Sequence, residues 1–460
     1  MVGSISRQPP GVRLDLRRSE GYRRLDAGCD AAGGVLLLKR VVVLGLDGTP
    51  FSLLKERMQR RPDSIWDRLQ RSGRLIRIRS TRPEVSSVAW ASYLTGADPG
   101  EHGLLGFVDR HPRPFQLYFP NGASLQTPTV LDKVHNAGGT VISINVPATF
   151  PPKPLRGLVI GGFLGVHLDA NVHPQDWLPR LQQLSYTIDV DPAGAYKDKA
   201  AFLDQLEQAL EARVRVALEA AERYDWNLLQ LHIMETDRLF HFFWDAPDWE
   251  PRFHRLLDRV DDAVETFSRL AARENASLVV LSDHGFTRTR KIFFLNRWLM
   301  DEGYLQFNGV PSWQTISDRT RAYALVPGRV FLAMRGRESF GSVAFGTEAE
   351  RLRDELLSRL SAIRDPDTGL PVFREVLARE DVYHGLQKER AAEVLAFPED
   401  GIDLKADLDT LRLFEKPTTL VGTHTYGNAF VYTNADDPKW KDAEASIIEV
   451  GQYVQRLLGV

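Results

Sequence analysis

The sequence predicts an α/β protein, built on a three-layer, doubly wound and mostly parallel sheet with helices on both faces. From Lys39 onward, short apolar runs alternate with longer segments of helical period, which is the pattern of alternating β and α units. The chain has 460 residues, of which 43% are hydrophobic. That length suffices for one large domain with insertions, or for two or three ordinary domains.

Four short apolar runs are the predicted strands of this sheet. They are rich in leucine or β-branched residues, which favour strands, and they span 41–46, 140–144, 228–233 and 277–281. Two longer segments, 202–223 and 253–270, repeat apolar residues at steps of three and four. This spacing predicts two amphipathic helices.

Three regions do not follow the alternation. The N-terminal segment contains six arginines within residues 1–34 and shows neither helical nor strand period, so we expect residues 1–38 to be a disordered tail. Residues 106–126 are rich in proline and aromatic side chains, and residues 300–415 mix short strand-like and helical stretches. We expect both to be loops or cap segments inserted into a main domain that spans 39–460.

Composition excludes several classes of function. Lys and Arg (58) nearly balance Asp and Glu (61), and the formal net charge is -3, so no global field attracts duplex nucleic acid or an anionic membrane. No apolar run approaches the roughly 18 residues of a membrane span. The only cysteine, Cys29, can form neither an internal disulfide nor a thiolate metal cluster. We therefore expect a soluble, cytoplasmic protein; the sequence leaves its oligomeric state open.

Acidic side chains follow three of the predicted strands. Asp47 and Asp283 come directly or almost directly after a strand, and Asp237 follows the strand at 228–233 by four residues. In open parallel sheets, ligands bind beyond the carboxyl ends of the strands, because the loops converge there. We therefore expect these carboxylates to lie near one another.

Histidines accompany the acids. His241 follows Asp237 by four residues, so both lie on one face if that turn is helical; His284 is adjacent to Asp283, and His424 lies in a glycine-flanked loop near the C-terminus. Six such O and N ligands make two three-ligand sites, suited to zinc or manganese. The other eight histidines are interpreted as surface, loop or packing residues.

A candidate nucleophile precedes a short apolar helix. Ser86 and Ser87 fall at the predicted N-terminus of this helix, where free N–H groups and the helix dipole favour an anion such as phosphate. Viewed in isolation, a serine at this position is more often a helix cap than a nucleophile. The sequence alone leaves both serines open for the role.

These motifs together resemble the alkaline phosphatase superfamily, in the branch of type I phosphodiesterases, nucleotide pyrophosphatases and bacterial predicted phosphohydrolase/phosphomutase proteins. The resemblance covers about 39–435. It rests on order and spacing: Leu44-Gly45-Leu46-Asp47-Gly48, the segment 86–103, Asp237 with His241, Ser282-Asp283-His284-Gly285, His424, and the segments 145–152 and 294–299.

The resemblance implies an alkaline-phosphatase-like fold and a phosphoric ester hydrolase with two divalent metal ions. Zinc is favoured by the resemblance, while manganese and iron fit the same ligands. Ser86 would be the nucleophile and form a phosphoseryl intermediate. Asp47, Asp283 and His284 would bind one metal, and Asp237, His241 and His424 the other.

Other functions stay open at this point. A phosphomutase uses the same phosphoserine but returns the phosphate to its substrate, and a non-catalytic relative would only bind an anion or a partner. The substrate is expected to be a small phosphate ester, with a diester or pyrophosphate favoured over a monoester. Arg110, Arg113 and Arg337 could bind a second phosphate, and Phe115, Tyr118 or Phe119 could stack on a base, but packing or solvation is favoured for each of them.

Overall fold

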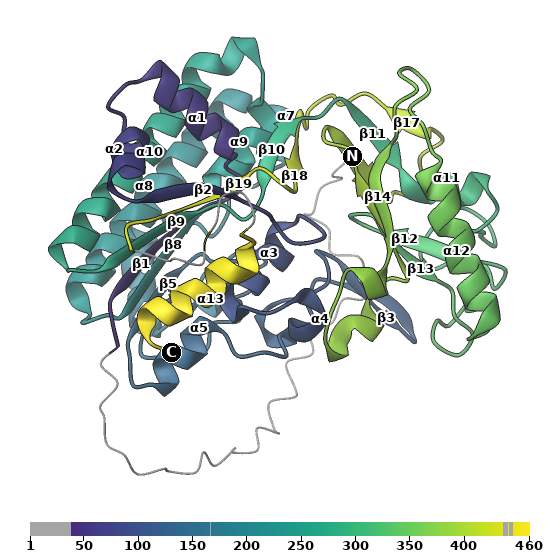
Figure 1. Cartoon of the computed structure of the whole chain (residues 1–460), viewed down its shortest axis with the longest axis horizontal. Helices are drawn as coiled ribbons and strands as arrows, with labels where there is room; N and C mark the ends of the chain where they lie inside the picture. The colour runs from purple at the N-terminus through teal and green to yellow at the C-terminus, as the bar shows by residue number, and fades with distance from the viewer. Residues whose placement is uncertain (1–37, 166, 436–439, 441–444) are drawn as a thin grey trace. The chain divides into compact units, whose positions relative to one another are not determined.

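An eight-stranded sheet organises the described chain (Figure 1). The computed structural model describes residues 38–435 except 166, together with 440 and 445–460; the predicted tail, apart from its last residue, lies outside these. In spatial order the strands are β2 (Arg74–Ile78), β19 (Ala429–Thr433), β9 (Ser277–Leu281), β1 (Val41–Leu46), β8 (Leu228–Ile233), β5 (Val141–Ile144), β6 (Gly157–Ile160) and β7 (Val172–His173).

The central part of the sheet is parallel. Strands β9, β1, β8, β5 and β6 run in the same direction, β19 is antiparallel to both of its neighbours, and β7 is antiparallel to β6. The four predicted strands are thus found, the one at 140–144 starting one residue later. This architecture confirms the predicted fold class.

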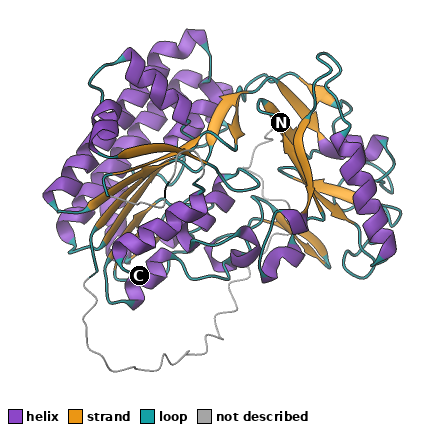
Figure 2. Cartoon of the chain, viewed as in Figure 1, coloured by secondary structure: helices purple, strands orange, loops and turns teal. Residues whose placement is uncertain are grey.

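Helices cover both faces of the sheet (Figure 2). Val42, Leu44 and Leu46 of β1 belong to one hydrophobic cluster, whereas Val41 and Val43 belong to another, because successive side chains of a strand point to opposite faces. On one face, the cluster includes side chains of α1 (Phe51–Arg60), α2 (Ile65–Ser72), α8 (Lys199–Arg223), α9 (Glu235–Phe243) and α10 (Glu250–Arg273). On the other face, it includes side chains of α3 (Ser86–Thr95), α5 (Val130–Asn136) and α13 (Ile447–Leu458).

Residues 285–425 add smaller sheets and a hydrophobic cluster of their own. The largest is four-stranded and antiparallel, and α12 (Thr347–Ser361) packs on it. Its strand order is β12 (Ala322–Leu325), β13 (Arg329–Leu332), β15 (Val394–Pro398) and β14 (Phe373–Ala378). A three-stranded sheet has β11 (Lys291–Phe294) between β16 (Ile402–Lys405) and β17 (Phe414–Glu415), and β10 (Gly285–Arg288) pairs with β18 (Gly422–Thr425). The helix α11 (Leu295–Asp301) directly follows β11.

Shorter elements complete the described chain. The proline-rich segment 106–126 contains a hairpin of β3 (Asp109–Pro112) and β4 (Phe115–Tyr118). Three short helices are α4 (Pro99–His102), α6 (Leu178–Gln183) and α7 (Gly194–Lys197). Within the described residues, no helix combines the length and apolarity needed to cross a membrane.

Candidate active site

The predicted ligands come together at the carboxyl edge of the large sheet. Asp47 follows β1, Asp283 and His284 follow β9, and the other three lie on α9 and β18. The candidate ligand atoms form two groups in which all atoms lie within 4.8 Å of one another: Asp47, Asp283 and His284 in one, and Asp237, His241 and His424 in the other. These groups coincide with the two predicted ligand sets.

Ser86 lies at the first of these groups. It is the first residue of α3, and its Oγ is 3.2 Å from Asp47 Oδ1 and 3.2 Å from His284 Nε2. The neighbouring Ser87 is buried, and its Oγ has no hydrogen-bond partner among the described residues. Of the two candidate nucleophiles, Ser86 is therefore the one in contact with the predicted ligands.

The three histidines present the same ring nitrogen to the site. Nδ1 lies 3.0 Å from Gly422 O in His241, 3.1 Å from Gly285 O in His284 and 2.9 Å from Glu84 O in His424. Because a carbonyl oxygen only accepts, each Nδ1 carries the proton. In the neutral ring the free lone pair is then on Nε2, which is the usual arrangement of a histidine that binds a metal.

The second group has a geometry that suits a cation. His241 Nε2 and His424 Nε2 lie 3.2 Å apart, and each is 3.4 Å from Asp237 Oδ1. Asp237 Oδ1 and Asp283 Oδ2 are buried atoms without a hydrogen-bond partner among the described residues. Buried carboxylate oxygens without donors are costly, and a bound cation at each group would satisfy them.

A family model for type I phosphodiesterases and nucleotide pyrophosphatases matches residues 41–427. The chain belongs to this family. The match confirms the resemblance to the alkaline phosphatase superfamily and the activity class, hydrolysis of phosphoric esters. A comparison with curated protein sequences gives no match.

Solved structures of this phosphodiesterase family's fold are similar over most of the chain. Phosphonoacetate hydrolase from Sinorhizobium meliloti 1021, in complex with phosphonoacetate, has a TM-score of 0.64 at 14% identity, covering 91% of this chain and 96% of its own. Murine ectonucleotide pyrophosphatase/phosphodiesterase 5 has a TM-score of 0.56 at 13% identity, covering 92% and 95%. At these identities the likeness establishes the fold.

The carboxylates of this phosphodiesterase-family protein repel one another. Burial raises the pKa of Asp47 well above its ordinary value, and the charges of Asp283 and Asp237 raise it further. Burial also raises the pKa of Asp283 to about 6. Two bound cations would relieve this repulsion. The donor set of three carboxylates and three imidazoles therefore fits divalent metal ions.

Histidine protonation in the metal-free protein follows from burial and from Asp237. Burial lowers the pKa of His241 to about 4. For His424, burial acts in the same direction, but the nearby Asp237 carboxylate outweighs it and raises the pKa to about 9. Burial would raise the pKa of Asp237, but the charges of His241, His424 and Arg238 hold it below its ordinary value.

Two residues at the site were missed by the sequence analysis. His232 on β8 is fully buried, and its Nε2 lies 2.7 Å from Asp47 Oδ2; it is one of the eight histidines interpreted from the sequence as surface, loop or packing residues. Arg238 donates to Asp237 Oδ2 at 3.0 Å and is itself held by Asp189 at 2.6 Å. Adjacency to Asp237 was the only sequence signal for Arg238, and His232 had none.

Two arginines considered for substrate binding are engaged by the protein's own carboxylates. Arg110 lies 3.5 Å from Glu338, and Arg337 lies 2.9 Å from Glu338 and 2.6 Å from Glu393. Arg110 also stacks on Phe331, 3.7 Å from the ring centre. The favoured packing interpretation therefore describes both side chains.

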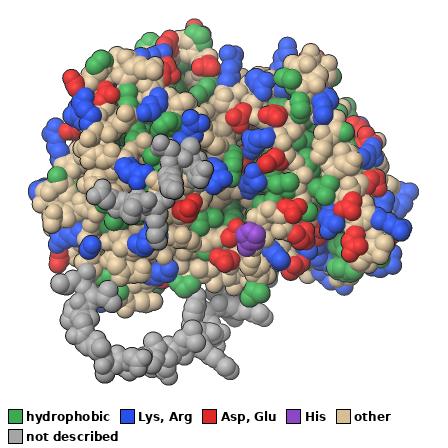
Figure 3. Space-filling view, in the orientation of Figure 1, with side chains coloured by type: hydrophobic (Ala, Val, Ile, Leu, Met, Phe, Trp, Pro, Cys, Tyr) green, Lys and Arg blue, Asp and Glu red, His purple; other side chains and the backbone are tan. Residues whose placement is uncertain are grey.

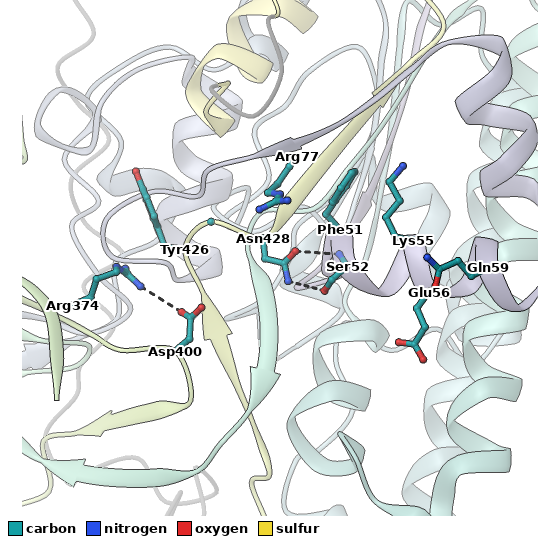
Figure 4. Close-up of a pocket in the computed structure, with 11 residues that line it drawn as sticks. Phe51, Ser52, Lys55, Glu56, Gln59, Arg77, Arg374, Asp400, Tyr426 and Asn428 are labelled. Atoms are coloured by element: carbon teal, nitrogen blue, oxygen red, sulfur yellow. Dashed lines mark hydrogen bonds and ion pairs between the residues drawn. The ribbon is translucent and has the colours of Figure 1, made fainter. Parts of the chain in front are cut away.

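A pocket of about 710 Å³ is lined by residues of α1, of β2, of β14, of the turn after β15 and of the segment after β18 (Figure 4). Arg77 and Lys55 both lie near the Phe51 ring, and Arg374 pairs with Asp400 at 3.4 Å. None of the seven predicted site residues lines this pocket. The pocket is therefore distinct from the two ligand groups, and substitutions in its lining can serve as controls for substitutions at the candidate site.

Proposed function

We propose that this protein is a metal-dependent phosphodiesterase, similar to nucleotide pyrophosphatases, that acts on a small phosphate ester through a phosphoseryl intermediate on Ser86. The observation that carries the proposal is the position of the Ser86 hydroxyl, in contact with both Asp47 and His284. Interspersed acidic and basic side chains on the face shown in Figure 3 support a small substrate rather than duplex nucleic acid.

The contacts of Ser86 support its proposed role as the nucleophile that attacks phosphorus. Its hydroxyl donates to Asp47 Oδ1, which fixes the oxygen at the end of α3, where the helix dipole favours the phosphate anion. In the proposed reaction the serine oxygen bonds to phosphorus while the bond to the leaving oxygen breaks. Hydrolysis of the phosphoserine then regenerates the hydroxyl.

Asp47, Asp283 and His284 would hold one divalent ion, and Asp237, His241 and His424 a second. When bound, such a pair lowers the pKa of the serine hydroxyl and neutralises charge on the attacking and leaving oxygens. We propose zinc because the family resemblance favours it; the ligand set suits zinc and fits manganese and iron as well. The single cysteine of the sequence supports a cytoplasmic location.

Turnover of two aryl esters tests this proposal. After reconstitution with zinc or manganese, we expect faster hydrolysis of bis(p-nitrophenyl) phosphate than of p-nitrophenyl phosphate. Preference for the monoester would contradict the phosphodiesterase assignment. Turnover of neither ester by protein with two bound metals would favour a phosphomutase, or a cap that excludes small aryl esters.

The nucleophile is tested with adjacent variants. Ser86→Ala should reduce turnover by about 10³-fold or more, because it removes the attacking oxygen, and should leave metal binding intact. Ser87→Ala is the matched control and should retain turnover. Full activity of Ser86→Ala, or loss only in Ser87→Ala, would contradict the assignment of Ser86.

A further inference from the structure

His232 lies next to the proposed metal site without belonging to either ligand group. His232 is on β8 and pairs with Gly45 of β1, which precedes Asp47 by two residues. The His232 side chain is fully buried. Its Nε2 is 2.7 Å from Asp47 Oδ2. Because a carboxylate only accepts, the imidazole donates the proton of this hydrogen bond.

This hydrogen bond gives the two oxygens of Asp47 different surroundings. Oδ2 accepts from His232, while Oδ1 accepts from the Ser86 hydroxyl and lies 3.5 Å from His284 Nε2. With Oδ2 held, the carboxylate cannot rotate without losing a buried hydrogen bond. Only Oδ1 is then presented to the site.

The other two carboxylates are held in the same way. Arg238 donates to Asp237 Oδ2, which leaves Oδ1 near both histidine nitrogens of its group. The backbone N–H of Gly48 donates to Asp283 Oδ1 at 3.0 Å, which leaves Oδ2 near His284. Each acidic side chain therefore has one oxygen restrained by a donor that is not itself a predicted ligand.

The packing around His232 fixes its ring. The edge of the Trp90 ring meets it with centroids 4.8 Å apart, and Trp90 occupies the space that the missing side chain of Gly45 leaves. Trp90 lies on α3, four residues after Ser86. The same contact thus connects the helix that carries the serine to the histidine that holds Asp47.

Packing alone does not explain a histidine at this position. His232 Nδ1 is buried and has no hydrogen-bond partner among the described residues, which costs free energy that an apolar ring of similar size would avoid. The bond to Asp47 is the one interaction of the imidazole that phenylalanine could not reproduce.

We infer that His232 is a positioning residue: its hydrogen bond to Asp47 Oδ2 directs Oδ1 alone toward the metal ion and Ser86. The inference rests on the metal site of the proposed function. Restraint of a ligand by such a partner is typically worth 10- to 100-fold in metal affinity.

Zinc titration of the metal-free protein tests the role of His232. Protein stripped with a chelator is titrated with zinc against a chromophoric competitor. We expect His232→Phe, which keeps the ring but lacks the donor, to bind one of two zinc ions about 10- to 100-fold more weakly than the wild type. His232→Gln, whose amide can donate to Asp47, should recover most of the affinity, and the shorter His232→Asn should not.

His102→Gln is the matched control, because His102 is equally buried but hydrogen-bonded to Ser92 and Leu104. It should bind zinc like the wild type. Wild-type affinity in His232→Phe, or equal affinities in the Gln and Asn variants, would overturn the inference while leaving the metal site intact. Absence of zinc uptake by the wild type would overturn the metal site itself, and this inference with it.

Discussion

Gly45 shows how a single residue position can determine the geometry of this site. A Cβ there would lie 2.2 Å from Cη2 of Trp90, so the contact between Trp90 and His232 requires glycine at this point of β1. Asp47 follows two residues later, and its carboxylate is held by the same histidine. The position of a proposed ligand thus depends on the absence of a side chain nearby.

We predict that Gly45→Ala lowers the free energy of unfolding by about 1–3 kcal/mol, because the added methyl group overpacks a closed core. Urea unfolding measures the change. Gly427→Ala serves as control, since a Cβ at Gly427 has no heavy atom within 4 Å. Equal stability of Gly45→Ala and the wild type would contradict the proposed packing.

The sequence allowed seven site residues to be predicted but not the residues that restrain them. Asp47, Asp237 and Asp283 could be found because each follows a recognisable strand, and their histidines are near in sequence or lie in a distinctive loop. His232 lies within an apolar strand, where a ligand-holding histidine and a packed one give the same pattern. Its role depends on the lateral pairing of β8 with β1, which periodicity does not reveal.

At the level of elements, α4 is attached to α3 by a buried histidine. His102 Nε2 lies 2.8 Å from Ser92 Oγ, and Nδ1 accepts from the N–H of Leu104 at 3.2 Å. Both contacts require a neutral ring with its proton on Nε2. Burial lowers the pKa of His102 to about 3.

This histidine predicts an acid-sensitive fold. The folded-state pKa lies below the unfolded value of about 6.5, so the unfolded state binds the extra proton first. Its contribution to stability is complete above about pH 6.5, and it is lost as pH falls toward 3, by up to about 1.4 kcal/mol per pH unit. Urea unfolding of wild type and His102→Gln between pH 7 and 4 measures this. A similar pH dependence in both proteins would contradict the prediction.

Four of the five strands of the parallel core were predicted, whereas β6 and the edge strands were not. Runs such as 41–46 and 278–281 lack charged and hydrogen-bonding side chains because both faces of the sheet are covered. In contrast, β2 (Arg74–Ile78) carries two arginines among its five residues, and β19 pairs with it from more than 350 residues away. Local pattern carries no information on such long-range pairing, nor on the strand order of the four-stranded sheet between 322 and 398.

At the scale of the whole molecule, the candidate site is assembled from segments between residues 47 and 424. The proposed nucleophile comes from α3, one candidate ligand group from the ends of β1 and β9, and the other from α9 and β18. These segments belong to the large sheet, to the helices beside it and to the β10–β18 pair. The site residues can therefore come together only when this core is folded. We propose that each of the two groups of three donors binds one metal ion.

Metal content per chain is the measurement that tests this claim most directly. After reconstitution with zinc and removal of loosely bound metal, elemental analysis should give about two zinc ions for the wild type. Asp283→Asn and Asp237→Asn should each retain about one, because each removes a charged ligand from a different group; the double variant should retain none. One zinc ion or fewer in the wild type, or full retention of two in both single variants, would contradict the two-site account.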